Sequence, residues 1–305
     1  MLNYAYDGVS SLDQIQLAAY GKVNMTLDIV GKRADGYHFL QSVMQSISIA
    51  DEVTLTTIPE QIIVTVDLPN IPTNENNIAW QAASAFFRET GTQGGVKIHI
   101  TKNIPTAAGL GGGTADGAAV LHGLNQLYGT SLSLRELQHI GSTVGADLPF
   151  CLQGGTVLVE GIGEKTTSLP DLPNIYFVLI NPGHKVSTAV VYKKLRKEAF
   201  GTSYTSRFVS YLKEHGPMTQ LATALGNSLE SVTAALIPDI EEWKKRLLQS
   251  NALGALMSGS GPTVFGLFKQ YDEACAFVER WKNEAVVMLA RPVRCGVKQL
   301  NGGDL

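Results

Sequence analysis

Polar and apolar residues alternate along residues 22–29 of the chain. The polar positions are Lys22, Asn24, Thr26 and Asp28, and the apolar positions are Val23, Met25, Leu27 and Ile29. A period of two is typical of a β-strand, in which successive side chains point to opposite faces. The segment is therefore predicted to be a strand with one buried face, and its polar side places Lys22 and Asn24 together.

Other apolar runs, separated by turn residues, predict further strands and helices. Strands are expected over residues 43–57, 62–66, 96–100, 156–160, 175–180, 252–257, 263–268 and 292–297. Helices are expected over residues 78–88, 134–142, 186–197, 221–236, 239–249 and 271–285. Gly91 is expected to stop the first helix, and Ser133 with Glu136 has the form of a capping box for the second. The prolines at residues 170–173 predict a boundary between two domains, residues 1–170 and residues 171–305.

A glycine-rich segment runs from Pro105 to Leu121, PTAAGLGGGTADGAAVL. Four of the five residues 109–113 are glycine, and apolar residues at helical spacing follow them. Glycine allows a positive φ and lets backbone N–H groups approach a ligand closely. Thr114 is a favourable N-cap residue, so a helix is expected to start behind it. A loop of bare amides that leads into a helix N-terminus favours a bound anion, and the segment is predicted to cradle phosphate.

Two common phosphate-binding loops do not fit this segment. A P-loop ends in Gly-Lys-Ser/Thr, whereas Gly113 is followed by Thr114 and Ala115. The dinucleotide fingerprint would need its third glycine at position 114. A flexible loop before a helix remains the alternative, because a glycine run alone does not identify a ligand-binding loop.

Composition narrows the range of functions. The 305 residues are 44% hydrophobic and 17% charged, which is typical of a globular protein of about two domains. The formal net charge of −3 provides no basic field for nucleic acid. Cys151, Cys275 and Cys295 are far apart without a C-x-x-C pair, which suits a reducing compartment. Neither a secretory signal pattern nor an apolar run of about 20 residues is found. A cytoplasmic monomer or weak homodimer without nucleic-acid or membrane partners is expected.

Three separated stretches resemble the GHMP kinases, the superfamily of galactokinase, homoserine kinase and mevalonate kinase. They are GKVNMTLDIVGKRADGYH at 21–38, PTAAGLGGGTADGAA at 105–119 with GADLPF at 145–150, and MSGSGPTVFGLF at 257–268. The resemblance implies an α+β, two-domain GHMP kinase fold. Its N-terminal domain would be a ribosomal-protein-S5-like α/β domain that binds nucleotide, and its C-terminal domain would be ferredoxin-like.

The run RADGYH at residues 33–38 resembles one branch of that superfamily. Members of this branch phosphorylate a methylerythritol linked to cytidine diphosphate, in non-mevalonate isoprenoid biosynthesis. The resemblance therefore implies an ATP-dependent kinase that acts on the 2-hydroxyl of this small molecule and releases ADP. ATP is expected as the co-substrate, together with Mg²⁺.

The resemblance implies that Lys22 and Asp147 are the catalytic residues. Asp147 would accept the proton of the acceptor hydroxyl, and Lys22 would lie beside Asp147 and the transferred phosphate. The sequence pattern alone favours other roles. A lysine at a strand start is usually a solvated edge residue, and an aspartate after a helix is usually a cap or turn residue.

The resemblance also assigns residues to two ligands. The expected ATP contacts are Pro105, Thr106, Ala107, Ala108, Gly109, Leu110, Gly111, Gly112, Gly113, Thr114, Ala115, Asn77 and Lys102. The expected contacts of the cytidyl substrate are Asn24, Tyr37, His38 and Thr188. Pattern alone would equally give Asn77 a capping role and Lys102 a surface position. No metal ligand is assigned.

One position departs from the family pattern. The family often has two hydroxyl residues after the glycines, and here Ala115 follows Thr114, so one polar contact of the loop is in doubt. The turn at residues 258–262 is expected to support the glycine loop without chemistry of its own.

Two rival functions remain. A GHMP kinase for homoserine or mevalonate is disfavoured by Tyr37 and His38, since those alcohols have no base to stack upon. A nucleotide-binding module without catalysis is disfavoured by the lysine–aspartate pair, because binding alone needs no proton acceptor.

Overall fold

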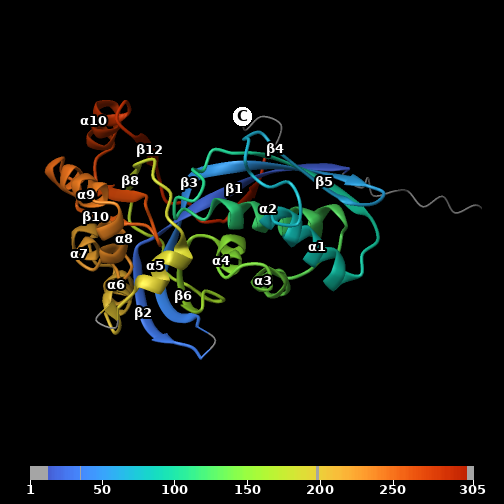
Figure 1. Ribbon diagram of the computed structural model, residues 1–305, viewed down its shortest axis with the longest axis horizontal. Coiled ribbons are helices and arrows are strands. Elements are labelled where there is room, and N and C mark those ends of the chain that lie inside the picture. Colours follow the sequence, from blue (N-terminus) through green and yellow to red (C-terminus); the bar gives the residue numbers. More distant parts are fainter. Residues whose placement is uncertain (1–12, 35, 197–198, 301–305) are drawn as a thin grey trace, which may run out of the picture.

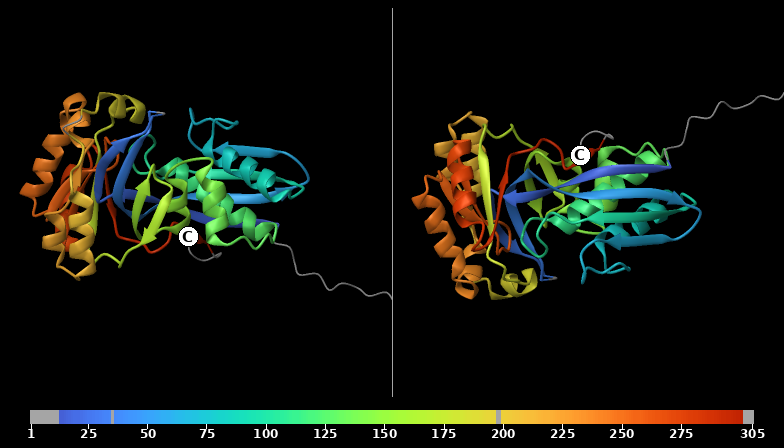
Figure 2. Two further views of the ribbon diagram at one scale, coloured as in Figure 1. Left: turned by 90° about the horizontal axis from the view of Figure 1, so that it is seen from below. Right: turned by 90° about the horizontal axis from the view of Figure 1, so that it is seen from above.

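The computed structural model describes residues 13–34, 36–196 and 199–300. The molecule is elongated and has two parts (Figure 1). A long sheet with four helices forms one part, and a smaller sheet with its own helices forms the other. The C-terminal segment returns from the smaller part to the larger one (Figure 2).

Strand β3 (His38–Ile58) organises the long sheet, which has nine strands in the described part of the chain. Its antiparallel partners are β1 (Gln14–Asn24), β2 (Thr26–Lys32), β5 (Gly95–Thr101) and β6 (Thr156–Gly161). The outer strands are β4 (Ile62–Val66) beside β5 and β7 (Lys165–Ser168) beside β6. Two strands from late in the chain join the same sheet, β9 (Gly226–Asn227) beside β2 and β13 (Val297–Gln299) beside β1.

Four helices cover one face of this sheet (Figure 1). They are α1 (Ile78–Thr90), α2 (Gly112–Leu127), α3 (Leu134–Ser142) and α4 (Leu148–Gln153). Helix α2 packs directly on β1 and β3, where Gly123 allows the close approach, since a Cβ there would lie 2.4 Å from Leu55 Cδ1. Gly91 ends α1 in the left-handed conformation, and Ser133 with Glu136 forms the capping box of α3, as predicted.

The smaller part has the predicted ferredoxin-like topology. Its strands are β8 (Tyr176–Asn181), β10 (Gly254–Met257), β11 (Val264–Phe268) and β12 (Val286–Ala290), in the spatial order β10-β11-β8-β12. The first crossover holds α5 (Thr188–Lys194), α6 (Tyr204–Lys213), α7 (Met218–Ala222), α8 (Glu230–Leu236) and α9 (Asp239–Gln249). The second crossover holds α10 (Tyr271–Trp281), so the sheet is built in the order βαββαβ.

A hydrophobic core joins the two parts. Val23 and Val43 of the long sheet pack in one buried cluster with Phe177 and Phe265 of the smaller sheet. Leu110 of the glycine loop belongs to the same cluster. Because this core draws on both sheets, it fixes the two parts against each other and anchors the glycine loop between them.

Residues 22–29 differ from the predicted single strand with one buried face. Strand β1 ends at Asn24 and β2 begins at Thr26, and the polar positions are 0–4% exposed. Helix α6 covers the polar side of β2, and its first N–H groups are capped by Asp28. The Asp28 carboxylate accepts hydrogen bonds from Thr205 N at 2.7 Å and Tyr204 N at 3.2 Å. Lys22 and Asn24, at the end of β1, are buried instead by contacts with other segments. A period-two pattern reports polarity along a strand, and it does not distinguish a solvated face from a buried polar one.

The single helix predicted over residues 221–236 is wrong. The chain forms α7, the short strand β9 and α8 instead, because this segment is tied to neighbours distant in sequence. A Cβ at Gly226 would lie 2.2 Å from Tyr204 Cδ1, and the Asn227 amide donates to Met257 O and Gly259 O at 2.9 and 2.7 Å. The strand predicted over 292–297 is also wrong, since β12 ends before it and β13 begins at its last residue.

Other elements were not predicted or have shorter bounds. The sequence analysis missed α4, α6, β7 and β12, and the helix predicted over 271–285 ends at Trp281. The helix predicted over 186–197 spans only Thr188–Lys194, with residue 197 outside the described residues. Because β9 and β13 belong to the long sheet, residues 171–305 contribute strands to both sheets, and the domain boundary at residue 170 stays a prediction. In the part of the chain that the structure describes, every helix is too short or too polar to cross a membrane.

Candidate active site

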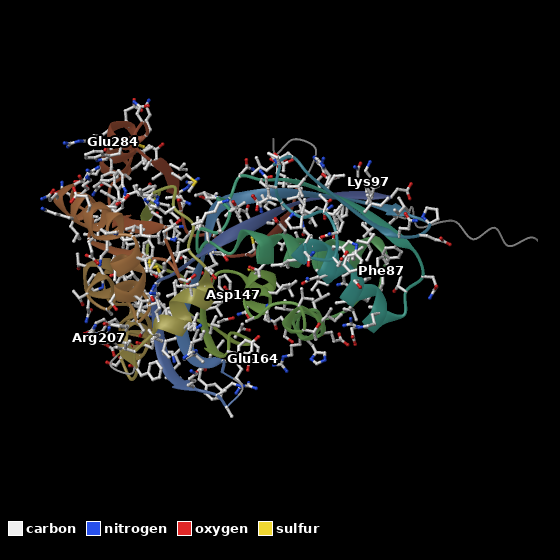
Figure 3. The ribbon with its side chains drawn as sticks, viewed as in Figure 1. Phe87, Lys97, Asp147, Glu164, Arg207 and Glu284 are labelled. Atoms are coloured by element: carbon white, nitrogen blue, oxygen red, sulfur yellow. The ribbon has the colours of Figure 1, made fainter. Side chains whose placement is uncertain are left out.

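A cavity of about 1290 Å³ opens between the two parts of the molecule. Its wall combines the glycine loop, the first turn of α2, the residue before α4, the β2–β3 hairpin, α5 and the turn at residues 259–261. In Figure 3, Asp147 lies near the middle of the molecule, beside α5. The fold thus brings to one cavity the three stretches that carry the family resemblance.

The glycine loop turns sharply into α2. Gly109 and Gly111 have φ values of 76° and 73°, a conformation that favours glycine. A Cβ on Gly109 would lie 2.3 Å from Ser258 O, and Lys22 N donates to Leu110 O at 2.9 Å. The first N–H groups of a helix have no acceptor within it, and the N-terminal residues of α2 line the cavity. This geometry suits an anion at the start of α2.

The start of α2 differs from the predicted cap. Gly111, not Thr114, is the N-cap residue, and the helix begins at Gly112. Thr114 lies in the first turn, where its hydroxyl donates to Gly111 O at 2.8 Å. The start is earlier because the left-handed Gly111 already reverses the chain into helical geometry.

Most predicted residues of the loop line the cavity, and two do not. Those that line it are Pro105, Thr106, Ala107, Ala108, Gly109, Gly111, Gly112, Gly113 and Thr114. The side chains of Leu110 and Ala115 are buried in the hydrophobic cores instead. Since position 115 faces the core, the missing second hydroxyl removes no side-chain group from the cavity wall.

Lys22 and Asp147 are brought together. Lys22 Nζ lies 3.5 Å from Asp147 Oδ2, and it donates to Asn24 Oδ1 at 2.7 Å. Asp147 occupies the N-cap position of α4, yet its side chain makes no capping hydrogen bond. Asp147 has helical backbone angles (φ −83°, ψ −6°) rather than the extended ones typical of a capping residue, and Pro149 at the second helical position has no N–H to donate. The carboxylate faces Lys22 instead. The lysine is buried, and the Asp147 side chain is 31% exposed toward the cavity.

The turn at residues 258–263 supports the glycine loop, as predicted. Ser258 Oγ donates to Gly109 O at 3.0 Å and accepts from Asn24 N at 3.2 Å. A Cβ on Gly259 would lie 3.4 Å from Lys22 Nζ, so the small residue leaves room for the ammonium. The turn thereby holds the loop and the lysine in one frame.

Three of the predicted substrate residues, Tyr37, His38 and Thr188, line another part of the cavity. The fourth, Asn24, is buried beside Lys22, and its amide is engaged by Lys22 and Ser42. Tyr37 is 64% exposed, and the His38 ring lies 5.2 Å from the ring of Tyr192 on α5. Burial lowers the pKa of His38, and the positive charge of Lys32 adds to this. The hydroxyl groups of Thr188 and Ser260 are 2.8 Å apart. Sequence reasoning missed Tyr192, whose phenol pKa is raised by burial and by the charge of Asp147.

Asn77 is a helix cap that also lines the cavity. Its Oδ1 accepts from Ala79 N at 2.8 Å at the start of α1, and its Nδ2 donates to Pro72 O at 2.6 Å. Both ends of the amide are therefore engaged, and the capping role is established. An additional contact to ATP stays a prediction.

Lys102 is buried rather than at the surface. Its ammonium pairs with Asp51 and, at 2.7 Å, with Asp116 in the first half of α2. Burial lowers the pKa of Lys102, but the two carboxylates outweigh this and raise it overall. Burial raises the pKa of Asp116 to about 8, with Lys102 opposing and Asp51 reinforcing the change. Neither aspartate was singled out as a site residue, because no local pattern marks them as partners of this lysine.

These features together suit phosphoryl transfer. The reaction needs a cradle for phosphates, a cation near the transferred group and a group that accepts the proton of the attacking hydroxyl. The glycine loop supplies amides, Lys22 a buried ammonium and Asp147 an accessible carboxylate within one cavity.

Comparison with known proteins identifies the family. The GHMP kinases N terminal domain matches residues 77–155, and the GHMP kinases C terminal domain matches residues 208–287. A 4-diphosphocytidyl-2-C-methyl-D-erythritol kinase of Alkaliphilus metalliredigens is 42% identical over 264 residues, which cover 86% of this chain and 91% of the relative. The kinase of the same name from Caldicellulosiruptor saccharolyticus is 44% identical, over 87% of this chain and 92% of the relative.

Solved structures agree with this relation. A crystal structure of 4-(cytidine 5'-diphospho)-2C-methyl-D-erythritol kinase has a TM-score of 0.76 at 33% identity and covers 91% of this chain and 99% of its own. Homoserine kinase from Cytophaga hutchinsonii has a TM-score of 0.80 at 22% identity, over 98% of this chain and 100% of its own. That second likeness shows the fold alone. The chain therefore belongs to the GHMP kinases, a family of ATP-dependent small-molecule kinases, and within it to the family of its 4-diphosphocytidyl-2-C-methyl-D-erythritol kinase relatives.

Proposed function

We propose that this protein transfers the γ-phosphoryl group of ATP to the 2-hydroxyl of 4-diphosphocytidyl-2-C-methyl-D-erythritol, in non-mevalonate isoprenoid biosynthesis. The products are the 2-phosphate and ADP. The names of relatives that are 42% and 44% identical support the substrate. The observation that carries the reaction type is the 3.5 Å approach of Lys22 to Asp147, between the glycine loop and the wall that bears Tyr37 and His38.

Asp147 is the proposed proton acceptor. As the substrate hydroxyl oxygen forms its bond to the γ-phosphorus, the bond from that phosphorus to the bridging oxygen of ADP breaks. The hydroxyl proton passes to the Asp147 carboxylate. Lys22 orients Asp147 and offsets the negative charge that develops on the moving phosphoryl group. Asn24 accepts a hydrogen bond from Lys22 at 2.7 Å and so limits the positions of the ammonium.

The glycine loop is the proposed cradle for the triphosphate. ATP enters as its magnesium complex, so Mg²⁺ is part of the co-substrate. It is a hard cation that keeps several waters and is held largely by phosphate oxygens. No group of three or more His, Cys, Asp or Glu side chains in residues 13–34, 36–196 and 199–300 is arranged to hold a metal. In this proposal the phosphate oxygens are the main ligands of the ion.

The cytidine end of the substrate is proposed to lie against Tyr37 and His38. The exposed Tyr37 ring offers a face for stacking, and a neutral imidazole offers one donor and one acceptor for a base edge. The lowered pKa of His38 favours this neutral form at neutral pH. Use of ATP and of a biosynthetic intermediate supports a cytoplasmic enzyme.

The homoserine and mevalonate kinases are the competing activities. The homoserine kinase of Cytophaga hutchinsonii matches the fold with a TM-score of 0.80, but at 22% identity it carries no argument about substrate. Neither small alcohol has a base that could stack on Tyr37 or bond to His38. An assay with each acceptor, rather than a comparison of folds, therefore distinguishes the proposed activity from these two.

The test is ADP release from Mg·ATP with three acceptors: the cytidyl methylerythritol substrate, homoserine and mevalonate. Only the cytidyl compound is expected to support turnover. Tyr37→Ala should raise KM for that compound by about tenfold, since stacking on one base contributes about 1–3 kcal/mol, and should leave KM for ATP unchanged. Turnover with homoserine or mevalonate instead would refute the proposed substrate. If none of the three acceptors supports ADP release, the proposed phosphoryl transfer is refuted.

A further inference from the structure

Lys102 is enclosed by two carboxylates beside the glycine loop. The Lys102, Asp51 and Asp116 side chains are 4%, 0% and 6% exposed. A Cβ on Gly112 would lie 3.3 Å from Lys102 Nζ, so the ammonium lies directly against the loop. Lys102 and Asp116 also line the cavity. If both aspartates were ionised, this cluster would carry a net negative charge beside the site proposed for phosphates.

The two carboxylates have different surroundings. Asp51 Oδ1 accepts from Asn103 N at 2.6 Å and from Ile104 N at 2.8 Å, while its Oδ2 pairs with Lys102. Backbone donors of this kind stabilise a carboxylate. Asp116 Oδ2 accepts from Lys102 and its side chain also meets that of Asp51, while its buried Oδ1 has no hydrogen-bond partner among the described residues. An ionised carboxylate with an unpaired buried oxygen is far more costly than a neutral acid.

The ionisable groups around Asp116 reinforce this difference. Burial raises the pKa of Asp116 to about 8, against the opposing effect of Lys102 and with the support of Asp51 on β3. From α4, Cys151 faces the same region, and burial raises its pKa to about 12, so it stays a neutral thiol. Lys22 of β1 is paired with Asp147 before α4 rather than with Asp116. The negative charge of the cluster therefore belongs on Asp51 and the proton on Asp116.

We propose that Asp116 is a positioning residue that works as a neutral acid, holding the Lys102 ammonium against the glycine loop without adding a negative charge. An ammonium has three donors, and among the described residues Lys102 Nζ uses two, to Asp51 and Asp116. The third serves the nucleotide phosphates. This inference rests on the proposed function, because the ligand that Lys102 awaits is the nucleotide.

The charge balance predicts how binding depends on pH. With Asp116 protonated the cluster has no net charge, and with Asp116 ionised it has one negative charge. A bound polyanion therefore favours the protonated form, and by linkage the affinity falls as pH rises through the pKa of Asp116 in the free protein. The loss approaches about tenfold per pH unit for one linked proton.

The test is calorimetric titration of the full chain with Mg·ADP at about pH 6.5, 7.5, 8.5 and 9.5. For the wild type, Kd should change little up to about pH 8 and then rise by up to about tenfold per unit. Asp116→Asn keeps the shape and fixes the neutral state, so it should bind within about threefold of wild type near pH 7 and lack this alkaline loss. Asp171→Asn, at an aspartate that is 53% exposed, is the matched control and should follow the wild type.

Two further measurements keep the inference testable if Asp116→Asn does not fold. Carbon NMR of the wild-type carboxyl groups should show one aspartate that titrates near pH 8 in the free protein. Asp51→Asn removes the neighbouring negative charge, so Asp116 should then ionise beside Lys102 at lower pH and the loss of affinity should begin at lower pH.

The outcomes separate the two proposals. If the wild type does not bind Mg·ADP at any pH, the nucleotide site of the proposed function is refuted. If it binds, but Asp116→Asn shows the same alkaline loss or binds far more weakly near neutral pH, the neutral-acid role is refuted. Complete ionisation of every aspartate below about pH 6 in the NMR titration would refute it as well.

Discussion

Two lysines flank the glycine loop, and their surroundings differ. Lys22 shares its ammonium between the Asn24 amide and the Asp147 carboxylate, which is 3.5 Å away and 31% exposed. Lys102 pairs with two carboxylates that are almost fully buried. The first pair is open to the cavity, whereas the second is almost fully buried, with only Lys102 and Asp116 among the residues that line the cavity.

In both places a lysine is paired with aspartate, but the exposure of the aspartate differs, and exposure decides what each carboxylate can do. A carboxylate that accepts a proton from a substrate must have an accessible oxygen, and the Asp147 side chain makes no capping hydrogen bond and is 31% exposed. A carboxylate that holds a lysine in place must be immobile, and burial provides this. We therefore expect changes to the open pair to alter turnover and changes to the closed cluster to alter stability and nucleotide affinity.

Asp147→Asn gives the largest expected effect on the open pair. The amide keeps the shape of the side chain but cannot accept the proton, so kcat should fall by about 10²–10⁴-fold. The Kd for Mg·ADP should stay within about twofold, since the phosphate contacts do not involve Asp147. Single-turnover kinetics and calorimetry measure the two effects, with Asp171→Asn as the control. Unchanged turnover would remove Asp147 from the role of base.

Lys102→Met tests the closed cluster. Removing the ammonium leaves Asp51 and Asp116 buried without a cation, which should lower the free energy of unfolding by about 3–5 kcal/mol near neutral pH. Burial of Asp116 holds its pKa above that of the unfolded chain, and without Lys102 nothing opposes this change. The deficit should therefore grow as pH rises from about 4 and shrink in acid. Urea unfolding at several pH values measures it.

The control for that variant is Lys282→Met. Lys282 pairs with Glu279 on the surface, where its side chain is 51% exposed. A surface pair contributes about 0–1 kcal/mol, so this variant should unfold almost as the wild type does. Equal losses in the two variants would show that burial of the Lys102 cluster does not matter to stability.

The sequence predicted the glycine loop and the Lys22–Asp147 pair better than it predicted the buried cluster around Lys102. The glycine loop has a strong local signature, and its place at the start of a helix follows from the backbone freedom of glycine. The approach of Lys22 to Asp147 was expected from the resemblance to a family, since nothing in the spacing of two residues so far apart implies a contact. The same resemblance led to the ferredoxin-like topology of the smaller part.

The closed cluster could not be predicted from local pattern. Asp51 lies within a strand of alternating residues, and Asp116 lies among small residues in a helix, so neither differs from an ordinary surface position. Only the fold shows that β3, β5 and α2 converge there. The buried polar side of residues 22–29 was missed for the same reason, because its burial by α6, Asp147 and Ser258 depends on segments far along the chain.

Two neighbouring glycines allow a finer comparison of the lysines. Gly111 has a φ of 73°, and a Cβ there would lie 3.0 Å from Lys22 Cγ. Gly112 has ordinary helical geometry, and its Cβ would lie 3.1 Å from Ile104 Cγ2 and 3.3 Å from Lys102 Nζ, the end of a flexible side chain. Gly111→Ala should therefore lower the free energy of unfolding by about 1–2 kcal/mol and also reduce kcat, because Lys22 must shift. Gly112→Ala should change stability by less than about 1 kcal/mol.

The conformational part of that cost has its own control. Gly183 is also left-handed, with a φ of 81°, and a Cβ there would meet no atom within 4 Å. Gly183→Ala should show the conformational loss of about 1–2 kcal/mol without any change in kcat. Chemical unfolding and steady-state kinetics of the three variants measure this. A kcat for Gly111→Ala as high as that of Gly183→Ala would mean that Lys22 tolerates displacement.

Cys151 gives the smallest expected effect, although it lies between the two lysine sites. Its Sγ is 3.7 Å from Thr114 Oγ1, and burial, followed by the charge of Asp147, raises its pKa to about 12. The thiol is therefore neutral and unreactive throughout the range in which the enzyme would work. Cys151→Ala should leave kcat within about twofold and lower the free energy of unfolding by about 1 kcal/mol, through the small cavity it leaves.

Iodoacetamide at about pH 8 should label the partly exposed Cys275 and Cys295 in the folded protein and spare Cys151. Rapid labelling of Cys151 with loss of turnover would place a reactive thiol between the open pair and the closed cluster, and the separation drawn between them would fail.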